Sequence, residues 1–156
     1  MPMFTEQELA AIEAIMSKYP DPKAALLPVL WLAQAKRGWI SEEVMREVAK
    51  ILGLPPSDVL GVTTFYTMYN KKPVGKYHLQ VCTNISCQLM GAETVVGRIR
   101  EKLKIGPGET TPDGKFTLSE VECLGSCGTA PVMQVNDDYH EALTPAKLDS
   151  LLESLA

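Results

Sequence analysis

The residues with the clearest potential for chemistry are the four cysteines, which fall into two tight pairs. Cys82 and Cys87 bound the segment CTNISC, and Cys123 and Cys127 bound the segment CLGSC. Thiolates are the ligands that iron-sulfur clusters and structural zinc select, and four thiolates that converge complete either centre. The sequence therefore predicts a metal centre built on these two pairs. Nothing in the spacing of serine, histidine and aspartate singles out a catalytic triad, and we expect no catalytic side chain.

Each cysteine pair follows directly on a segment with the pattern of a β-strand, YHLQVC for the first pair and FTLSEVEC for the second. A strand would deliver the first cysteine of each pair, and the loop after it could fold back to bring the second alongside. Two such corners form one cage of four sulfurs. Plant-type ferredoxins take most of their ligands from one long loop, so we expect a different scaffold for the same ligand set.

Two other interpretations of the sulfurs compete with an iron-sulfur cluster. An even number of cysteines allows disulfides, but the first residues, MPMFTEQELAAIEAIM, lack the basic and apolar regions of a secretory signal, so we expect no oxidising compartment. Structural zinc sites place their ligands on short knuckles, and both spacings lie within the range that such knuckles tolerate. Spacing alone leaves zinc open.

The residues around the sulfurs favour a [2Fe-2S] cluster. Such a cluster with four thiolates is dianionic and gains a further charge on reduction, so it needs backbone N–H donors and an apolar shell. Gly91, Gly125 and Gly128 give the loops the freedom to point amides inward. The residues expected to form the shell, which any buried loop would also have, are Leu89, Met90, Leu124, Pro131 and Met133.

Two long segments carry a family resemblance. KYHLQVCTNISCQLMGAE and PDGKFTLSEVECLGSCGTAPVMQVND closely resemble the thioredoxin-like [2Fe-2S] ferredoxins, and among them the small iron-sulfur subunits of NADH:quinone oxidoreductase, respiratory complex I. The resemblance continues upstream through LGLPPSDVLGVTTFYTMYNKKPVGKY and covers nearly the whole chain. It implies one [2Fe-2S] cluster with Cys82, Cys87, Cys123 and Cys127 as its ligands.

The resemblance also implies a function, that of a one-electron carrier subunit of an NADH dehydrogenase. A [2Fe-2S] centre takes or gives one electron without changing its ligands, so substrate chemistry must belong to another chain. In the family, NADH passes hydride to FMN on a partner flavoprotein subunit, and the cluster exchanges electrons with that flavin. The equivalent diaphorase subunit of an NAD-linked hydrogenase or formate dehydrogenase fits the same residues. The alternative from another class is a zinc-stabilised interaction module.

Composition restricts the partners. No apolar run approaches the ~20 residues that a membrane span requires, so we expect no direct membrane insertion. The formal net charge of -4 argues against nucleic-acid binding, because phosphate contacts need a clustered basic face, and the cluster of Lys71, Lys72 and Lys76 has the composition of a solvated linker. We expect a cytoplasmic protein, peripheral to the membrane through its parent complex. A homodimer of the isolated chain stays open.

Hydrophobic periodicity predicts an α+β (α/β-like) protein with an N-terminal helical bundle over 1–72 and a thioredoxin-like [2Fe-2S] domain over 73–156. Four helices are expected in the first part, which the resemblance makes a docking module for the partner; they begin after Thr5, near Asp21, after Ser41 and near Ser57. The fourth should extend to Tyr69. Pro28 predicts a kink in the second helix, or a helix that starts there.

The second part is expected to follow the order of the thioredoxin fold, βαβ and then ββα. Its predicted elements are strands at 77–81 and 116–122, a helix at 92–103, hairpin strands at 131–135 and 139–143, and a last helix that opens at Thr144 and Pro145. By analogy with such folds, the peptide bond before Pro131 should be cis. The chain has no CxxC motif, so thiol-disulfide exchange is not expected, and neither His78 nor His140 is assigned as a ligand.

Charge near the cysteines predicts a low reduction potential for the cluster. No lysine or arginine occurs between Val81 and Ala92 or between Val121 and Met133, and Glu122 adjoins a cysteine. No cation within these segments would favour the extra negative charge of the reduced state.

Overall fold

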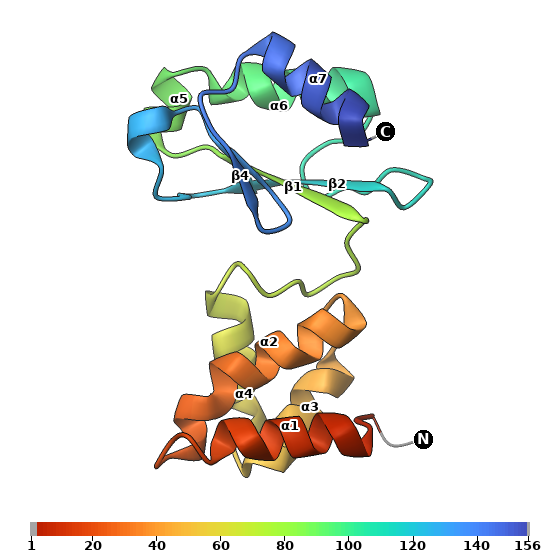
Figure 1. Cartoon of the computed structure of the whole chain (residues 1–156), viewed down its shortest axis with the longest axis vertical. Helices are drawn as coiled ribbons and strands as arrows, with labels where there is room; N and C mark the ends of the chain where they lie inside the picture. Colours follow the sequence, from red (N-terminus) through yellow and green to blue (C-terminus); the bar gives the residue numbers. More distant parts are fainter. Residues whose placement is uncertain (1–2, 156) are drawn as a thin grey trace. The chain divides into compact units, whose positions relative to one another are not determined.

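The computed structural model describes residues 3–155 (Figure 1). Backbone contacts divide the chain into two compact units, Met1–Pro73 and Val74–Ala156. Each unit has its own hydrophobic core. Within residues 3–155, none of the helices combines the length and the apolar character that crossing a membrane would need.

The first unit is built from helices. They are α1 (Glu6–Met16), the short 3-10 helix η1 (Pro22–Ala25), α2 (Leu26–Arg37), α3 (Glu42–Leu52) and α4 (Pro56–Phe65). The predicted capping box is present: the Thr5 hydroxyl accepts from the Glu8 N–H at 3.2 Å, and the Glu8 carboxylate accepts from the Thr5 N–H at 2.9 Å. Gly38 and Gly53 end α2 and α3 with φ of 78° and 65°, a conformation that glycine adopts without steric cost.

Two predicted helix limits in the first unit are wrong. Asp21 caps the 3-10 turn η1 as predicted, but the α-helix α2 begins only at Leu26, which is still ahead of Pro28. Pro28 therefore lies in the first turn, where a backbone N–H would have no partner within the helix in any case. Helix α4 ends at Phe65 rather than at Tyr69. Tyr69 lies beyond the helix, although its position matches the helical spacing of the buried residues before it. Its ring is buried at 1% exposure, and its hydroxyl donates to the Leu27 carbonyl at 2.9 Å.

The second unit is a mixed sheet with its two longer helices on one face (Figure 1). Its elements are β1 (Tyr77–Cys82), α5 (Ile85–Leu89), α6 (Ala92–Leu103), β2 (Phe116–Val121), η2 (Cys127–Thr129), β3 (Met133–Val135), β4 (Asp138–His140) and α7 (Pro145–Leu155). The strand order is β2-β1-β3-β4. Strand β1 runs parallel to β2 and antiparallel to β3, and β3 pairs antiparallel with β4.

The core of the second unit lies between the sheet and helices α6 and α7. Alternate residues of β1, Leu79 and Val81, are fully buried there. They belong to one cluster with Ile99 of α6 and Leu148 of α7, both also at 0% exposure. The apolar faces of α6 and α7 thus cover one face of the sheet. This packing fixes the strands that carry the cysteines.

The predicted α+β class and the order βαβ then ββα are confirmed, and α6 has the predicted bounds. The peptide bond between Ala130 and Pro131 is cis, as expected by analogy. Two short elements of the second unit were not predicted, the turn η2 and a helix in the segment between the first two cysteines, which was expected to be a loop. The short helix α5 begins within this segment, with Asn84 as its N-cap and Cys87 inside it.

Candidate metal centre

The cysteines lie beyond the ends of two neighbouring parallel strands. Cys82 is the last residue of β1 and pairs in register with Val121, the last residue of β2. The N–H of Thr83 donates to the Val121 carbonyl at 2.9 Å, so the segments that follow β1 and β2 leave the sheet side by side. Because parallel strands end at the same edge of a sheet, Cys82 and the segment of Cys123 emerge on the same side.

Cys82 and Cys87 form a buried pair. Their exposed fractions are 2% and 1%, and they share a small apolar cluster with Ala92, Ala130 and Val132. Burial raises the pKa of the Cys87 thiol, and a hydrogen bond with Cys82 raises it further. A backbone hydrogen bond at Val132 acts in the opposite direction. The raised pKa favours the protonated form of the Cys87 thiol, and binding a metal there would release its proton.

Cys123 and Cys127 lie on an exposed segment that has no regular structure apart from the single turn η2. Gly125 adopts a φ of 75°, and its N–H donates to the Cys123 sulfur at 3.3 Å. This is one of the amide-to-sulfur contacts that the glycine pattern predicted. Cys127 is close enough to Cys87 for its charge to raise the pKa of that thiol.

The donor set consists of two pairs. All four cysteines are free thiols. Within the described part of the chain, 3–155, no three His, Cys, Asp or Glu side chains are grouped around one metal position. A [2Fe-2S] cluster takes two thiolates on each iron, so it needs pairs and not three donors around one ion. The four free thiols are chemically suitable ligands for such a cluster. Cys82 and Cys87 are in contact, and Cys127 is close enough to interact electrostatically with Cys87.

The predicted apolar shell is only partly present. Leu124 packs on the cluster of Cys82 and Cys87, and Pro131 is buried. Met133 is buried too, but in the main core. The prediction is wrong for Leu89 and Met90, which are 81% and 62% exposed. Helix α5 is too short to bury more than the side that carries Cys87, so its other apolar residues face solvent.

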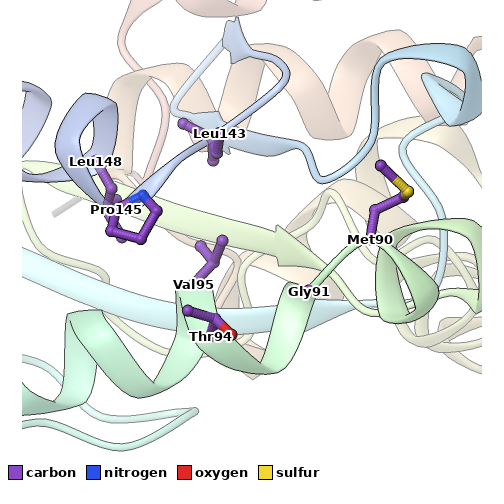
Figure 2. Close-up of a pocket in the computed structure, with 7 residues that line it drawn as sticks. All are labelled: Met90, Gly91, Thr94, Val95, Leu143, Pro145 and Leu148. Carbon is purple, nitrogen blue, oxygen red and sulfur yellow. The ribbon is translucent and has the colours of Figure 1, made fainter.

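A small cavity lies next to this region, between the starts of α6 and α7 (Figure 2). Its volume is about 130 Å³, below the ~300 Å³ of the smallest usual ligand pockets. The residues that line it are Met90, Gly91, Thr94, Val95, Leu143, Pro145 and Leu148. Thr94 brings the one polar side-chain group among them, so the cavity offers little to orient a polar ligand.

Two residues that no sequence motif marks contact the segment of the second cysteine pair. Tyr139 and Glu141 come from β4 and the chain just after it. The Tyr139 hydroxyl donates to the Leu124 carbonyl at 2.9 Å, and the Glu141 carboxylate accepts from Thr129 at 2.6 Å. Only the folding of β4 beside β3 brings these side chains to that segment, so no pattern in the sequence could have indicated them.

Comparison with known proteins gives consistent results. A subunit of the NADH-quinone oxidoreductase of Rhizobium meliloti (strain 1021) is 51% identical over 143 residues, which are 92% of this chain and 85% of that protein. NADH-quinone oxidoreductase subunit 2 of Thermus thermophilus is 48% identical over 155 residues, 97% of this chain and 86% of that protein.

A solved structure supports the fold. The crystal structure of an NAD+-reducing [NiFe]-hydrogenase in the air-oxidized state contains a chain that matches with a TM-score of 0.72. The match covers 83% of this chain and 22% of that chain, at 22% identity. The family model of the thioredoxin-like [2Fe-2S] ferredoxins matches residues 12–156, and its name states the cofactor that the cysteine motifs predicted. This chain belongs to the thioredoxin-like [2Fe-2S] ferredoxin family.

Proposed function

We propose that this chain is the one-electron carrier subunit of an NADH-quinone oxidoreductase, and that Cys82, Cys87, Cys123 and Cys127 hold its [2Fe-2S] cluster. The proposal rests on one observation. Two cysteine pairs stand at the carboxyl ends of neighbouring parallel strands, in a chain 51% identical over most of its length to a subunit of that enzyme.

The residues around the cysteines would give the two sides of the centre different environments. When bound, a [2Fe-2S] cluster supplies reversible one-electron transfer. The apolar cluster around Cys82 and Cys87 excludes water from one side. The segment of Cys123 and Cys127 is exposed and leaves the other side near the surface. A short path to the surface favours electron exchange with a partner, and the Gly125 amide stabilises negative charge on the Cys123 sulfur.

The proposed partner is a flavoprotein subunit that binds NADH and FMN. Three apolar side chains of the short segment around α5, Ile85, Leu89 and Met90, are between 62% and 81% exposed beside the buried Cys87. Apolar side chains gathered at the surface mark interaction sites, and here they adjoin a proposed ligand. The helical unit Met1–Pro73 would add a second docking surface, to which Leu60 and Phe65 of α4 contribute exposed apolar area.

The place of the chain in the cell follows from this assignment. As a subunit of an NADH-quinone oxidoreductase it would be cytoplasmic and attached to the membrane through the parent complex. In the isolated chain, the apolar residues of α5 could instead cover those of a second copy, which would give a homodimer. Sedimentation of the isolated chain and of its mixture with the flavoprotein subunit separates these outcomes.

The hydrogenase alternative has weaker support. The likeness to the NAD+-reducing hydrogenase is at 22% identity and concerns the fold alone, whereas the curated relatives at 48% and 51% are subunits of NADH-quinone oxidoreductase. No comparable observation favours a formate dehydrogenase. The zinc-stabilised module remains the alternative from another class, and it makes an opposite analytical prediction.

The deciding experiment is metal analysis of the chain purified without oxygen. We expect a red-brown protein with iron and acid-labile sulfide in equal amounts, and an electron paramagnetic resonance (EPR) signal after reduction by dithionite. A colourless protein that holds one zinc per chain and no sulfide would overturn the proposal. Reduction of the cluster by NADH only when the flavoprotein subunit is added would support the assignment of NADH and FMN to that partner.

A further inference from the structure

The segment that carries Cys123 and Cys127 has little structure of its own. Between β2 and β3 its only regular element is the turn Cys127–Thr129. Both cysteines are exposed, and so is Thr129. A segment of this kind keeps one shape only if contacts from elsewhere hold it, because each residue otherwise retains its backbone freedom.

Contacts from the chain just after β4 supply that restraint. The Glu141 carboxylate accepts hydrogen bonds from the hydroxyls of Ser126 and of Thr129, the latter at 2.6 Å. The N–H of Ala142 donates to the Thr129 carbonyl at 2.7 Å. Ser126 directly precedes Cys127, so the carboxylate is attached one residue away from a proposed ligand.

The backbone beside Glu141 is in an unfavourable conformation. Ala142 has a φ of 47°, in the left-handed region that residues with a side chain rarely adopt. The structure maintains it because the bonds from Ala142 to Thr129 and from the Leu143 N–H to the Pro131 carbonyl, at 3.1 Å, hold the two segments together. Conformational strain of this kind persists where surrounding contacts over-determine it, often at functional sites.

We propose that Glu141 is a positioning residue for the metal centre. It holds the segment of Cys123 and Cys127 in place, binds the hydroxyl protons of Ser126 and Thr129, and so keeps the reduction potential of the cluster low. This inference rests on the proposed function, since it concerns the same site.

Two effects act in the same direction. Glu141 places a negative charge beside the cluster, which disfavours the added electron of the reduced state. Hydrogen bonds from Ser126 and Thr129 hold the pKa of Glu141 below its ordinary value, so the charge is present at neutral pH. In addition, each hydroxyl has one proton to donate, and a proton bonded to Glu141 is not available to a sulfur ligand. Hydrogen bonds to the sulfurs raise the potential, so bonding of these two hydroxyl protons to Glu141 keeps it lower than it would otherwise be.

The test compares midpoint potentials of the loaded chain, measured by EPR during redox titration. Glu141→Gln keeps the size and an acceptor oxygen but removes the charge. We expect the equilibrium constant for reduction to rise roughly threefold to tenfold, about 30 to 59 mV for one electron. Asp137→Asn is the matched control, because it removes the same charge at the turn between β3 and β4. A change in Glu141→Gln no larger than in Asp137→Asn would overturn the proposal.

Further measurements separate the effect of the Glu141 charge from the effect of the hydroxyl protons. They also provide a test in case Glu141→Gln takes up no cluster. The charge effect should shrink as salt is added, because Glu141 is exposed to solvent. The amide oxygen of Glu141→Gln is a weaker acceptor than the carboxylate and holds the hydroxyls less firmly. In that background, Ser126→Ala should remove the part of the increase that comes from the Ser126 hydroxyl. If Glu141→Gln does not load, Thr129→Val breaks the same contact from the other side. The charge of Glu141 remains and no hydroxyl is freed, so we expect little change in potential but faster amide exchange of residues 123–129 than in the unmodified chain. Unchanged exchange in Thr129→Val would then reject the positioning role.

Failure of this inference is distinguishable from failure of the proposed function. Iron, sulfide and the EPR signal of the unmodified chain test whether a [2Fe-2S] cluster is held at all. The shift in midpoint between variants tests only whether Glu141 sets its potential. Amide hydrogen exchange of residues 123–129 in the loaded variants gives an additional readout, and we expect faster exchange in Glu141→Gln than in Asp137→Asn.

Discussion

Arg98 of α6 and Asp149 of α7 form an ion pair with two parallel contacts, from Nε to Oδ1 at 3.0 Å and from Nη2 to Oδ2 at 2.7 Å. Lys102 adds a third contact to Asp149 at 3.0 Å. These bonds hold the pKa of the Asp149 carboxyl far below its ordinary value. They fasten to each other the two helices that cover the sheet, and paired planar groups do this with defined geometry.

The first prediction concerns this ion pair and acid. Because the pKa of Asp149 is lower in the folded chain than in the unfolded one, its stabilising effect is complete above the unfolded pKa of about 3.9 and is lost as the pH falls below it. Asp149→Asn should lower the thermal midpoint at pH 7 and flatten the loss of stability below pH ~4. Glu101→Gln is the control, since Glu101 makes a single exposed contact with Arg98 at 3.2 Å. Equal effects of both variants would contradict the prediction.

The second prediction concerns His78, whose ring lies 2.8 Å from the Ser119 hydroxyl on β2. Burial lowers the pKa of His78 below its ordinary value, so the fold favours the neutral ring. Stability should therefore be complete above a pH of about 6.5 and decline as the pH falls through that value. Nuclear magnetic resonance titration of the imidazole checks the direction, and His78→Gln should weaken the pH dependence. A His78 pKa above about 6.5 would be the contrary result.

The third prediction concerns the cysteines themselves. Cys87→Ala should abolish the visible absorption and the EPR signal of the loaded chain, because one iron would lose a ligand in the buried pair. Ser86→Ala is the matched control on the same short helix, and it should retain both signals. Full retention of iron and sulfide by Cys87→Ala would remove Cys87 from the ligand set.

The fourth prediction concerns the exposed apolar side of α5. Leu89→Glu should weaken binding to the flavoprotein subunit about tenfold or more, which is ~1.4 kcal/mol, because an interface would bury the new charge without a partner. Pro107→Glu adds the same charge at an exposed position of the loop after α6 and should leave affinity unchanged. Titration calorimetry measures both, and equal affinities would place the interface elsewhere.

The fifth prediction concerns the reduction potential. The segments between Val81 and Ala92 and between Val121 and Met133 contain no lysine or arginine, so we expect a negative midpoint potential. Redox titration followed by EPR measures it directly. A clearly positive midpoint would mean that backbone amides such as that of Gly125 outweigh the absence of nearby cations.

Much of this protein could be read from its sequence because the signals are local. Thr5 and Ser41 cap their helices through bonds to residues three positions along the chain. Helix α6 has the predicted bounds because its apolar positions recur at helical spacing over its whole length. The two cysteine pairs were visible as motifs because each pair is close in sequence and follows a strand directly.

Other features depended on contacts that the linear pattern does not contain. Tyr69 continued the helical period only because its ring enters a core formed by residues far along the chain. Leu89 and Met90 were expected to shield the sulfurs, yet α5 buries only the side of Cys87 and leaves them in solvent. Burial is decided by which elements pack together, and periodicity within one segment cannot report it.

The sequence by itself determined the identity of the proposed ligands, the order of helices and strands and the family of the chain, since spacing and periodicity carry these directly. Only the tertiary structure decided that Cys82 and Cys87 are buried in contact while Cys123 and Cys127 are exposed, and that Glu141 bonds to the segment of the second pair. The physical reason is that hydrogen bonds and burial act between residues that are close in space, and the pairing of β4 with β3 is what brings Glu141 to Ser126 and Thr129.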